Sequence, residues 1–125
     1  MLHRRIFRRD ASGFFNYGVA TVLGCSLDGD LFATAMVGHD GHRGWVYYLA
    51  VAPDRQESGL GRSMMEACEQ WLIDRGAIKV QLMIRSDNSP VIGFYDQLGY
   101  ELSDVQVRAK WLKADAHAHT GSAAL

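Results

Sequence analysis

The first half of the chain carries three apolar stretches separated by polar, glycine-containing turns. Val19–Leu27 is apolar and partly β-branched, and Leu31–Val37 follows it after Asp28-Gly29, a dipeptide typical of tight hairpin turns. Trp45–Val51 is nearly continuous in apolar and aromatic residues, so we expect it to be buried on both faces. The pattern predicts three antiparallel strands in a meander.

An amphipathic helix is predicted after these strands. It begins near Leu60 and ends before Gly76, and its apolar residues recur at steps of three and four, so that they form one stripe. Lys79–Ile84 is then typical of a short strand. Because a helix connects it to Trp45–Val51, we expect these two strands to pair in parallel.

A second amphipathic helix and a closing segment make up the rest of the chain. Ser89 suits the N-cap of this helix, Pro90 suits its first turn, and Gly99 ends it. Glu101–Leu112 is predicted to form one or two closing strands. Residues 114–125 are expected to form a flexible tail.

Composition and charge narrow the class of protein. With 125 residues, 48% of them hydrophobic and 22% charged, the chain fits one soluble domain, and a net charge of −1 gives no reason to expect nucleic acid or a membrane as a partner. No apolar run reaches the roughly 18 residues of a transmembrane helix. Cys25 and Cys68 lack a metal-type spacing, so we expect both to be reduced core residues in the cytoplasm. We expect no metal site, because the tail histidines His117 and His119 lack partner ligands.

The start of the chain is basic and shows no hydrophobic period. Its arginines are Arg4, Arg5, Arg8 and Arg9. We expect residues 1–18 to be disordered or atypical, and the alternative is an arm that binds nucleic acid. Residues 19–113 are then expected to form the folded domain.

Two glycines stand where the first helix should begin. The first turn of a helix presents backbone N–H groups without partners and a partial positive charge, so it can hold an anion. Side chains near this first turn would block the anion, which is a reason for glycine at positions 59 and 61. Alternatively, Gly59 and Gly61 are only part of an ordinary helix start. A phosphate or pyrophosphate is the expected ligand. Neither a P-loop nor a dinucleotide fingerprint fits, because Arg62 and Met64 stand where Lys and Gly are needed.

The wider context of these glycines is more specific. Val51-x-Pro53-x-x-Gln56-x-x-Gly59-Leu60-Gly61 resembles the acetyl-CoA-binding motif of the GNAT acetyltransferases. The segment D-N-S-P-V-I-G-F-Y-D-Q-L-G-Y, residues 87–100, is similar to the family's segment around its fourth helix. The resemblance covers residues 19–112, and G-H-D-G-H-R-G-W-V-Y-Y-L-A-V within it is similar to small bacterial members.

The resemblance implies an α/β (α+β) fold. Its mixed, mostly antiparallel central sheet is flanked by helices and has a V-shaped splay between the fourth and fifth family strands. The backbone exposed at the splay pairs with the pantetheine arm of acetyl-CoA, and the N–H of Val51 is the expected donor to the thioester carbonyl, worth about 3 kcal/mol in comparable sites. The implied cofactor-binding residues are Leu49, Ala50, Val51, Gln56, Glu57, Ser58, Gly59, Leu60, Gly61, Arg62, Asn88 and Tyr95.

The resemblance also implies the reaction. A neutral primary amine attacks the acetyl group directly in a ternary complex, so neither cysteine is needed as a nucleophile. Tyr95 matches the position from which the family often protonates the departing CoA thiolate, and its alternative is a packing role beside Phe94. Tyr47 and Tyr48 either line the acceptor pocket or only pack within their strand. The general base stays unassigned, because this strand carries no carboxylate.

The sequence departs from the family at two places. Glu57 puts a negative charge where the diphosphate should bind, and the 18 residues before the hairpin are too few for the helices that build one wall of the acceptor site. A second subunit, in a homodimer, would cover the core that a missing wall exposes. Two functions therefore stay open. One is an acetyl-CoA-dependent N-acetyltransferase for a small amine or a protein amino group, and the other is a module that binds CoA or a partner protein without turnover.

Overall fold

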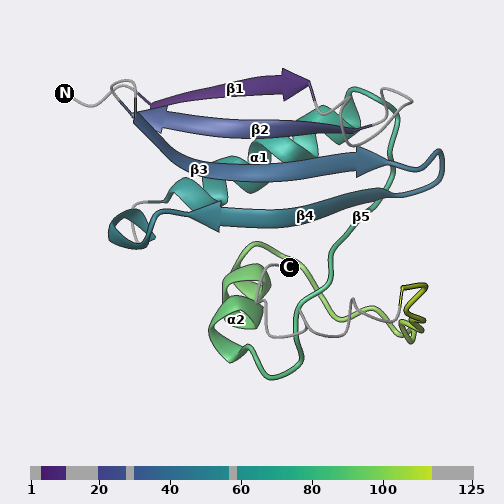
Figure 1. Ribbon diagram of the computed structural model, residues 1–125. Coiled ribbons are helices and arrows are strands. Elements are labelled where there is room, and N and C mark those ends of the chain that lie inside the picture. The colour runs from purple at the N-terminus through teal and green to yellow at the C-terminus, as the bar shows by residue number, and fades with distance from the viewer. Residues whose placement is uncertain (1–3, 11–19, 28–29, 57–58, 114–125) are drawn as a thin grey trace. The chain divides into compact units, whose positions relative to one another are not determined.

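The computed structural model describes residues 4–10, 20–27, 30–56 and 59–113 (Figure 1). The predictions made for Asp28-Gly29, for Glu57 and Ser58, and for the tail at 114–125 lie outside these residues. The chain divides into two units, one that ends at Met83 and one that begins at Ile84. Each unit is described by itself.

The first unit contains a five-stranded sheet in the order β1-β2-β3-β4-β5. Its strands are β1 (Arg4–Asp10), β2 (Ala20–Leu27), β3 (Asp30–His39), β4 (Gly44–Val51) and β5 (Val80–Gln81). The first four are antiparallel to their neighbours, and β5 is parallel to β4. The predicted meander and the parallel crossover strand are confirmed, although β5 is shorter than the predicted Lys79–Ile84.

β1 shows that the prediction of a disordered basic start was wrong for residues 4–10. This strand pairs with β2 along its whole length, from Arg4 opposite Leu27 to Asp10 opposite Thr21. An edge strand needs a partner on one side only, and charged residues are common there because they discourage further pairing. A segment with four arginines can therefore be a strand although it has no hydrophobic period.

The helix α1 (Leu60–Ile73) covers one face of the sheet and contacts β2, β3 and β4 (Figure 1). Its buried residues confirm the predicted stripe: Leu60, Gly61, Met64, Met65, Cys68, Trp71 and Leu72. The strand residues buried on the sheet include Leu23, Cys25, Ala33, Ala35, Val37 and Val46. Cys25 and Cys68 are buried and form no disulfide, as predicted for small core residues.

β4 is not buried on both faces, contrary to the prediction from its continuous apolar run. Gly44 and Val46 are buried, whereas Ala50 is exposed and Tyr48 is 51% exposed. Among the described residues of the first unit, α1 is the one α-helix, and it contacts β4. Trp45 and Tyr47 are half-buried and Tyr48 is exposed, so the apolar run of β4 is not that of a fully buried strand.

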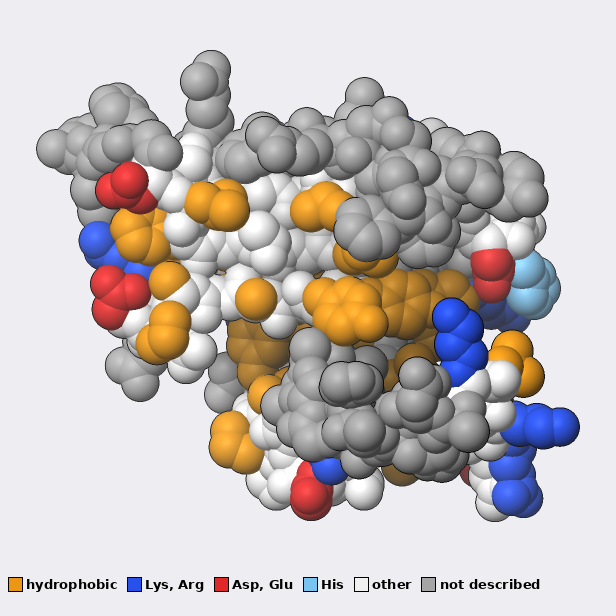
Figure 2. Space-filling view, viewed as in Figure 1, with side chains coloured by type: hydrophobic (Ala, Val, Ile, Leu, Met, Phe, Trp, Pro, Cys, Tyr) orange, Lys and Arg blue, Asp and Glu red, His pale blue; other side chains and the backbone are white. Residues whose placement is uncertain are grey.

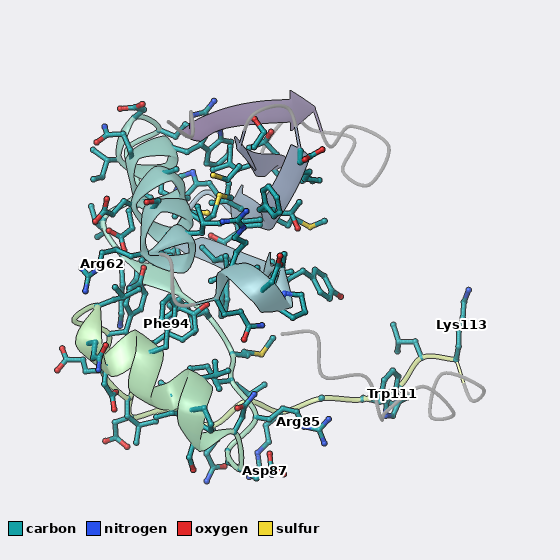
Figure 3. The ribbon with its side chains drawn as sticks, turned by 90° about the vertical axis from the view of Figure 1, so that its left-hand side faces the viewer. Arg62, Arg85, Asp87, Phe94, Trp111 and Lys113 are labelled. Carbon is teal, nitrogen blue, oxygen red and sulfur yellow. The ribbon has the colours of Figure 1, made fainter. Side chains whose placement is uncertain are left out.

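The second unit contains α2 (Ser89–Gln97). Its N-cap is Asn88 rather than the predicted Ser89, while Pro90 lies in the first turn as predicted. The prediction of closing strands over Glu101–Leu112 was wrong, since no strand is formed there and Trp111 lies on an extended, exposed segment (Figure 3). An alternating pattern becomes a strand only where a neighbouring strand supplies hydrogen bonds, and a sequence pattern does not guarantee that neighbour.

Candidate active site

A β-bulge divides β4 into two halves. Tyr48 and Leu49 of β4 both lie opposite Ala35 of β3, because the register shifts between Thr34 and Met36. Tyr48 has a φ of 56°, the one positive φ outside glycine among the described residues. Bulges bend a strand and are frequent next to active sites, and a bulky residue in this conformation is strained.

Beyond the bulge, one edge of β4 is open. β5 pairs only with Gly44 and Trp45, at the beginning of β4. Among the described strands, none lies beside Tyr47–Val51 on that side. This divergence of β4 and β5 corresponds to the V-shaped splay that the family resemblance implied.

Val51 presents its backbone to the open edge. The N–H of Ala52 donates to the carbonyl of Phe32 on β3 at 2.8 Å. Because the backbone groups of successive strand residues point to opposite sides, those of Val51 point away from β3. The carbonyl of Val51 accepts a hydrogen bond from Nε2 of Gln56 at 3.4 Å, which agrees with that direction. The N–H of Val51 faces the same side.

The chain passes from β4 through the short helix η1 (Pro53–Arg55) into α1. Gly59 is the N-cap of α1 with a φ of 81°, and no atom lies within 4 Å of the position that a Cβ would take. The carbonyl of Gly59 accepts the first helical hydrogen bond, from the N–H of Ser63 at 3.1 Å. The preceding N–H groups have no acceptor within the helix and form a place for an anion. They belong to Leu60, Gly61 and Arg62.

Leu60 and Gly61 are buried, whereas Arg62 is exposed and extends away from α1 (Figure 3). A side chain at Gly59 would need a left-handed backbone, which L-residues other than glycine rarely adopt. The open approach and the exposed guanidinium are what a doubly charged diphosphate requires. The residues present therefore fit the predicted anion.

Three aromatic rings lie on β4 near the bulge. Val46 is buried with α1 on its face of the sheet, so Trp45 and Tyr47 lie on the other face, over which Figure 2 shows hydrophobic side chains. The ring centroids of Trp45 and Tyr47 are 6.2 Å apart, and those of Tyr47 and Tyr48 are 6.4 Å apart. Burial, followed by the charge of Asp40, raises the pKa of Tyr47.

Asp40 clamps the loop between β3 and β4. Its Oδ1 accepts hydrogen bonds from the backbone N–H groups of His42 at 2.8 Å and Arg43 at 2.6 Å, and its Oδ2 accepts one from Nε1 of Trp45 at 3.2 Å. The two backbone hydrogen bonds are the main reason that the pKa of Asp40 is lowered to about 2. Such a weak base does not take a proton from an ammonium group. The sequence signal for this clamp is an Asp followed by a glycine turn, which is typical of an Asx-turn.

The second unit holds the two remaining predicted site residues. Asn88 is half-buried and its side chain does not cap α2. Tyr95 is 5% exposed, and its ring packs edge-on against Phe94 at 4.9 Å and against Tyr100 at 5.5 Å between centroids. This packing fixes the direction of the Tyr95 ring.

The described residues contain no group of three or more His, Cys, Asp or Glu that could hold a metal ion. Neither of their two α-helices is long and apolar enough to cross a membrane. Burial raises the pKa of Cys68 to about 12, so its thiol stays protonated. In the first unit, the open edge of β4 and the first turn of α1 are the features that can bind a ligand through backbone groups.

Comparison with known proteins shows the family to which this chain belongs. The model of the acetyltransferase (GNAT) family matches residues 3–100, so the matched part begins within the segment that the sequence placed outside the domain. Among solved structures, an aminoglycoside N-acetyltransferase, AAC(6')-Iy, in complex with CoA is similar over 90% of this chain and 97% of its own, with a TM-score of 0.75 and 11% identity.

Two further structures share the fold. The ribosomal-protein-S18-alanine N-acetyltransferase from Escherichia coli is similar over 78% of this chain and 77% of its own chain, with a TM-score of 0.65 and 21% identity. The glucosamine-6-phosphate N-acetyltransferase from Arabidopsis thaliana is similar over 89% of this chain and 99% of its own chain, with a TM-score of 0.69 and 17% identity. The chain belongs to the acetyltransferase (GNAT) family, and its enzyme class is that of the acetyl-CoA-dependent N-acetyltransferases.

Proposed function

We propose that this protein transfers the acetyl group of acetyl-CoA to a primary amine by direct attack in a ternary complex. The observation that carries the proposal is the open edge of β4 at Tyr47–Val51, which leads through η1 into the first turn of α1. One continuous segment thus offers strand-like hydrogen bonds and then an anion-binding turn. CoA has the matching order of groups, an amide-bearing arm followed by a diphosphate.

Acetyl-CoA supplies the acetyl group as a reactive thioester. In the proposed site, Leu49, Ala50 and Val51 pair with the pantetheine arm as an added strand would, and the N–H of Val51 donates to the thioester carbonyl. The backbone N–H groups at the start of α1 hold the diphosphate, and Arg62 adds a positive charge. Gln56 holds the turn through its bond to the Val51 carbonyl. Asn88 hydrogen-bonds the amide region of the arm.

The acceptor nitrogen must be neutral before it attacks, so its proton first passes to solvent. A carbon–nitrogen bond then forms while the carbon–sulfur bond breaks, and the electron pair of that bond leaves with the sulfur. The attacking nitrogen, which is positively charged once the bond has formed, loses one further proton to solvent to give the neutral amide. The hydroxyl of Tyr95 donates a proton to this sulfur and is reprotonated from solvent. Asp40 does not act as the base, because its pKa is about 2.

The acceptor in this proposal is a small amine or a protein amino group. The similar structures do not choose between these, since their names give an aminoglycoside, a ribosomal protein and an amino sugar phosphate. We also place the protein in the bacterial cytoplasm, where the free thiols of Cys25 and Cys68 would stay reduced. A homodimer, in which a second subunit covers core that one subunit leaves exposed, belongs to the same proposal.

A second candidate function is a module that binds CoA without turnover. It is favoured by one specific observation: among the described residues, the carboxylate hydrogen-bonded to an aromatic residue of β4 is that of Asp40, which accepts three hydrogen bonds and is too weak a base. Such a module would gain thermal stability with CoA and release no CoA from acetyl-CoA.

The experiment measures two quantities on the same protein. Calorimetry gives the affinity for CoA, and a thiol assay gives the CoA released from acetyl-CoA in the presence of a panel of amines. Binding with amine-dependent release supports the transferase, binding without release supports the module, and no binding contradicts both. Arg62→Glu should weaken CoA binding about tenfold or more, while Arg108→Glu, the same charge change in the second unit, should not.

A further inference from the structure

The rings of Tyr47 and Tyr48 lie unusually close for neighbours in a strand. In a regular strand, successive side chains point to opposite faces of the sheet. Here the two ring centroids are 6.4 Å apart with an interplanar angle of 40°. The bulge and the positive φ of Tyr48 account for this, because they turn the side chain of Tyr48 out of the regular alternation.

Together with Trp45, these tyrosines form a ladder of three rings, called here the aromatic ladder. It adjoins the half of β4 whose edge is open. Strained backbone persists where the surrounding fold holds it and concentrates at functional sites. The strain at Tyr48 extends the ladder by one ring toward Val51, which indicates that the third ring has a function.

The electrostatic surroundings of the aromatic ladder favour a cation. Ring faces carry a negative potential, and the ionised carboxylate of Asp40 accepts a hydrogen bond from Trp45 at 3.2 Å. The nearby guanidinium of Arg43 is directed to the carbonyl of His42 at 3.3 Å. A cation–ring contact already exists on this sheet, since Cζ of Arg55 lies 4.8 Å from the ring centroid of Phe32.

A surface that favours cations is unsuitable for the nitrogen that reacts. That nitrogen must lose its proton before it attacks, and a cation-binding surface would keep it protonated. The aromatic ladder is instead suited to a second nitrogen that stays charged throughout. Tyr48 and Val51 are three residues apart along β4, which corresponds to about 10 Å.

We propose that the aromatic ladder binds the distal ammonium group of a diamine or polyamine acceptor, while the other nitrogen of that acceptor reaches the acetyl group beside Val51. This inference rests on the proposed function and names the substrate class of the same site. The extended spacer between the two nitrogens should measure about 10 Å or more.

The kinetic test compares straight-chain diamines, from diaminopropane to diaminodecane, with the monoamines of equal length. The diamines should show kcat/KM values about tenfold higher, since a cation held on aromatic rings is worth about 1–2 kcal/mol. This preference should be greatest once the extended spacer reaches about 10 Å. Equal kcat/KM values for each diamine and its monoamine would overturn the inference and leave the transferase proposal intact.

Substitutions locate the effect. Tyr48→Leu and Tyr47→Leu should reduce the preference for diamines to about twofold or less, whereas Tyr48→Phe should retain it, because the ring is kept. Trp111→Leu is the matched control for loss of an exposed aromatic residue elsewhere in the chain and should change nothing. CoA affinity is measured for each variant as a test of folding. A preference that survives both leucine substitutions would contradict the role of the aromatic ladder.

A separate binding measurement distinguishes failure of this inference from failure of the proposed function. If CoA binds but no amine causes its release, the transferase proposal fails. Calorimetry of the CoA-bound protein with diaminooctane and with octylamine still tests the aromatic ladder. Tighter binding of the diamine that is lost in Tyr48→Leu supports the inference, and equal affinities overturn it.

Discussion

Gly44, the first residue of β4, lies directly against Leu72 of α1. A Cβ at Gly44 would approach Cδ1 of Leu72 to 2.6 Å, closer than real carbon contacts allow. Leu72 is 2% exposed and has little room to move. The N–H of Gly44 also donates to the carbonyl of Lys79 at 2.8 Å, so this close approach coincides with the point where β5 joins β4 and the splay begins.

Gly44→Ala should therefore destabilise the fold by about 1–3 kcal/mol, because the added methyl group overpacks the contact with Leu72. Thermal unfolding should show a Tm lower by about 4–15 °C. Gly93→Ala is the matched control: no atom lies within 4 Å of its Cβ position on α2, so it should be neutral or stabilising. The double variant Gly44→Ala/Leu72→Ala should show less than the sum of its two single effects, and strict additivity would contradict the proposed clash.

Asp40 should make the stability of the protein depend on acidity. Its pKa is lowered from 3.8 to about 2 in the folded protein, so the carboxylate contributes its full stabilisation above about pH 4, and this is lost progressively as the pH falls toward about 2. Urea unfolding across this range should show a steeper fall for the wild type than for Asp40→Asn. Parallel curves for the two proteins would mean that Asp40 is not the group responsible.

Cys25 and Cys68 should not react with a thiol reagent in the folded protein. Both thiols are buried, which hinders access of a reagent, and burial raises the pKa of Cys68 to about 12, so Cys68 carries almost no thiolate at neutral pH. A colorimetric thiol assay without reductant should detect no thiol in the native state and two after unfolding in guanidinium. The variants Cys25→Ser and Cys68→Ser should each show one reactive thiol after unfolding. Detection of none after unfolding would indicate a disulfide.

Gln56→Leu should weaken the binding of CoA about threefold to tenfold. The substitution removes the hydrogen bond from Nε2 to the carbonyl of Val51, which connects the open edge of β4 to the turn before α1, and one hydrogen bond of this kind is worth about 0.5–1.5 kcal/mol. Isothermal titration with CoA measures the change. Gln70→Leu removes a comparable exposed hydrogen bond, to Asp74 on α1, and should leave the affinity unchanged. Equal losses in both variants would show that the effect is not local.

Tyr95→Phe should keep its edge-on packing against Phe94 and Tyr100, because only the hydroxyl is removed. If the hydroxyl protonates the leaving sulfur, kcat should fall about a hundredfold with the KM for acetyl-CoA little changed. Steady-state rates on the best acceptor amine measure this. A rate within about twofold of the wild type would leave Tyr95 only its packing role.

The sequence predicted correctly those features that depend on a single segment of the chain. The stripe of α1 follows from apolar residues at steps of three and four, and the meander from three apolar runs separated by glycine turns. The motif from Val51 to Gly61 predicted an anion site at a helix start, and α1 does begin at Leu60, because backbone N–H groups at a helix start do not depend on distant residues. These features indicated the family from the sequence alone.

The tertiary structure decided whatever depends on a neighbour in space. β1 became a strand because β2 offered a free edge to Arg4–Asp10, whereas Glu101–Leu112 pairs with no described strand and forms none itself. The burial of β4 on one face, and the bulge that brings Tyr48 beside Tyr47, depend on how β3 and α1 meet that strand. A hydrogen-bonding partner, a covering helix or a register shift each involves two segments that meet in space. The pattern of residues along one segment does not say which other segment it will meet.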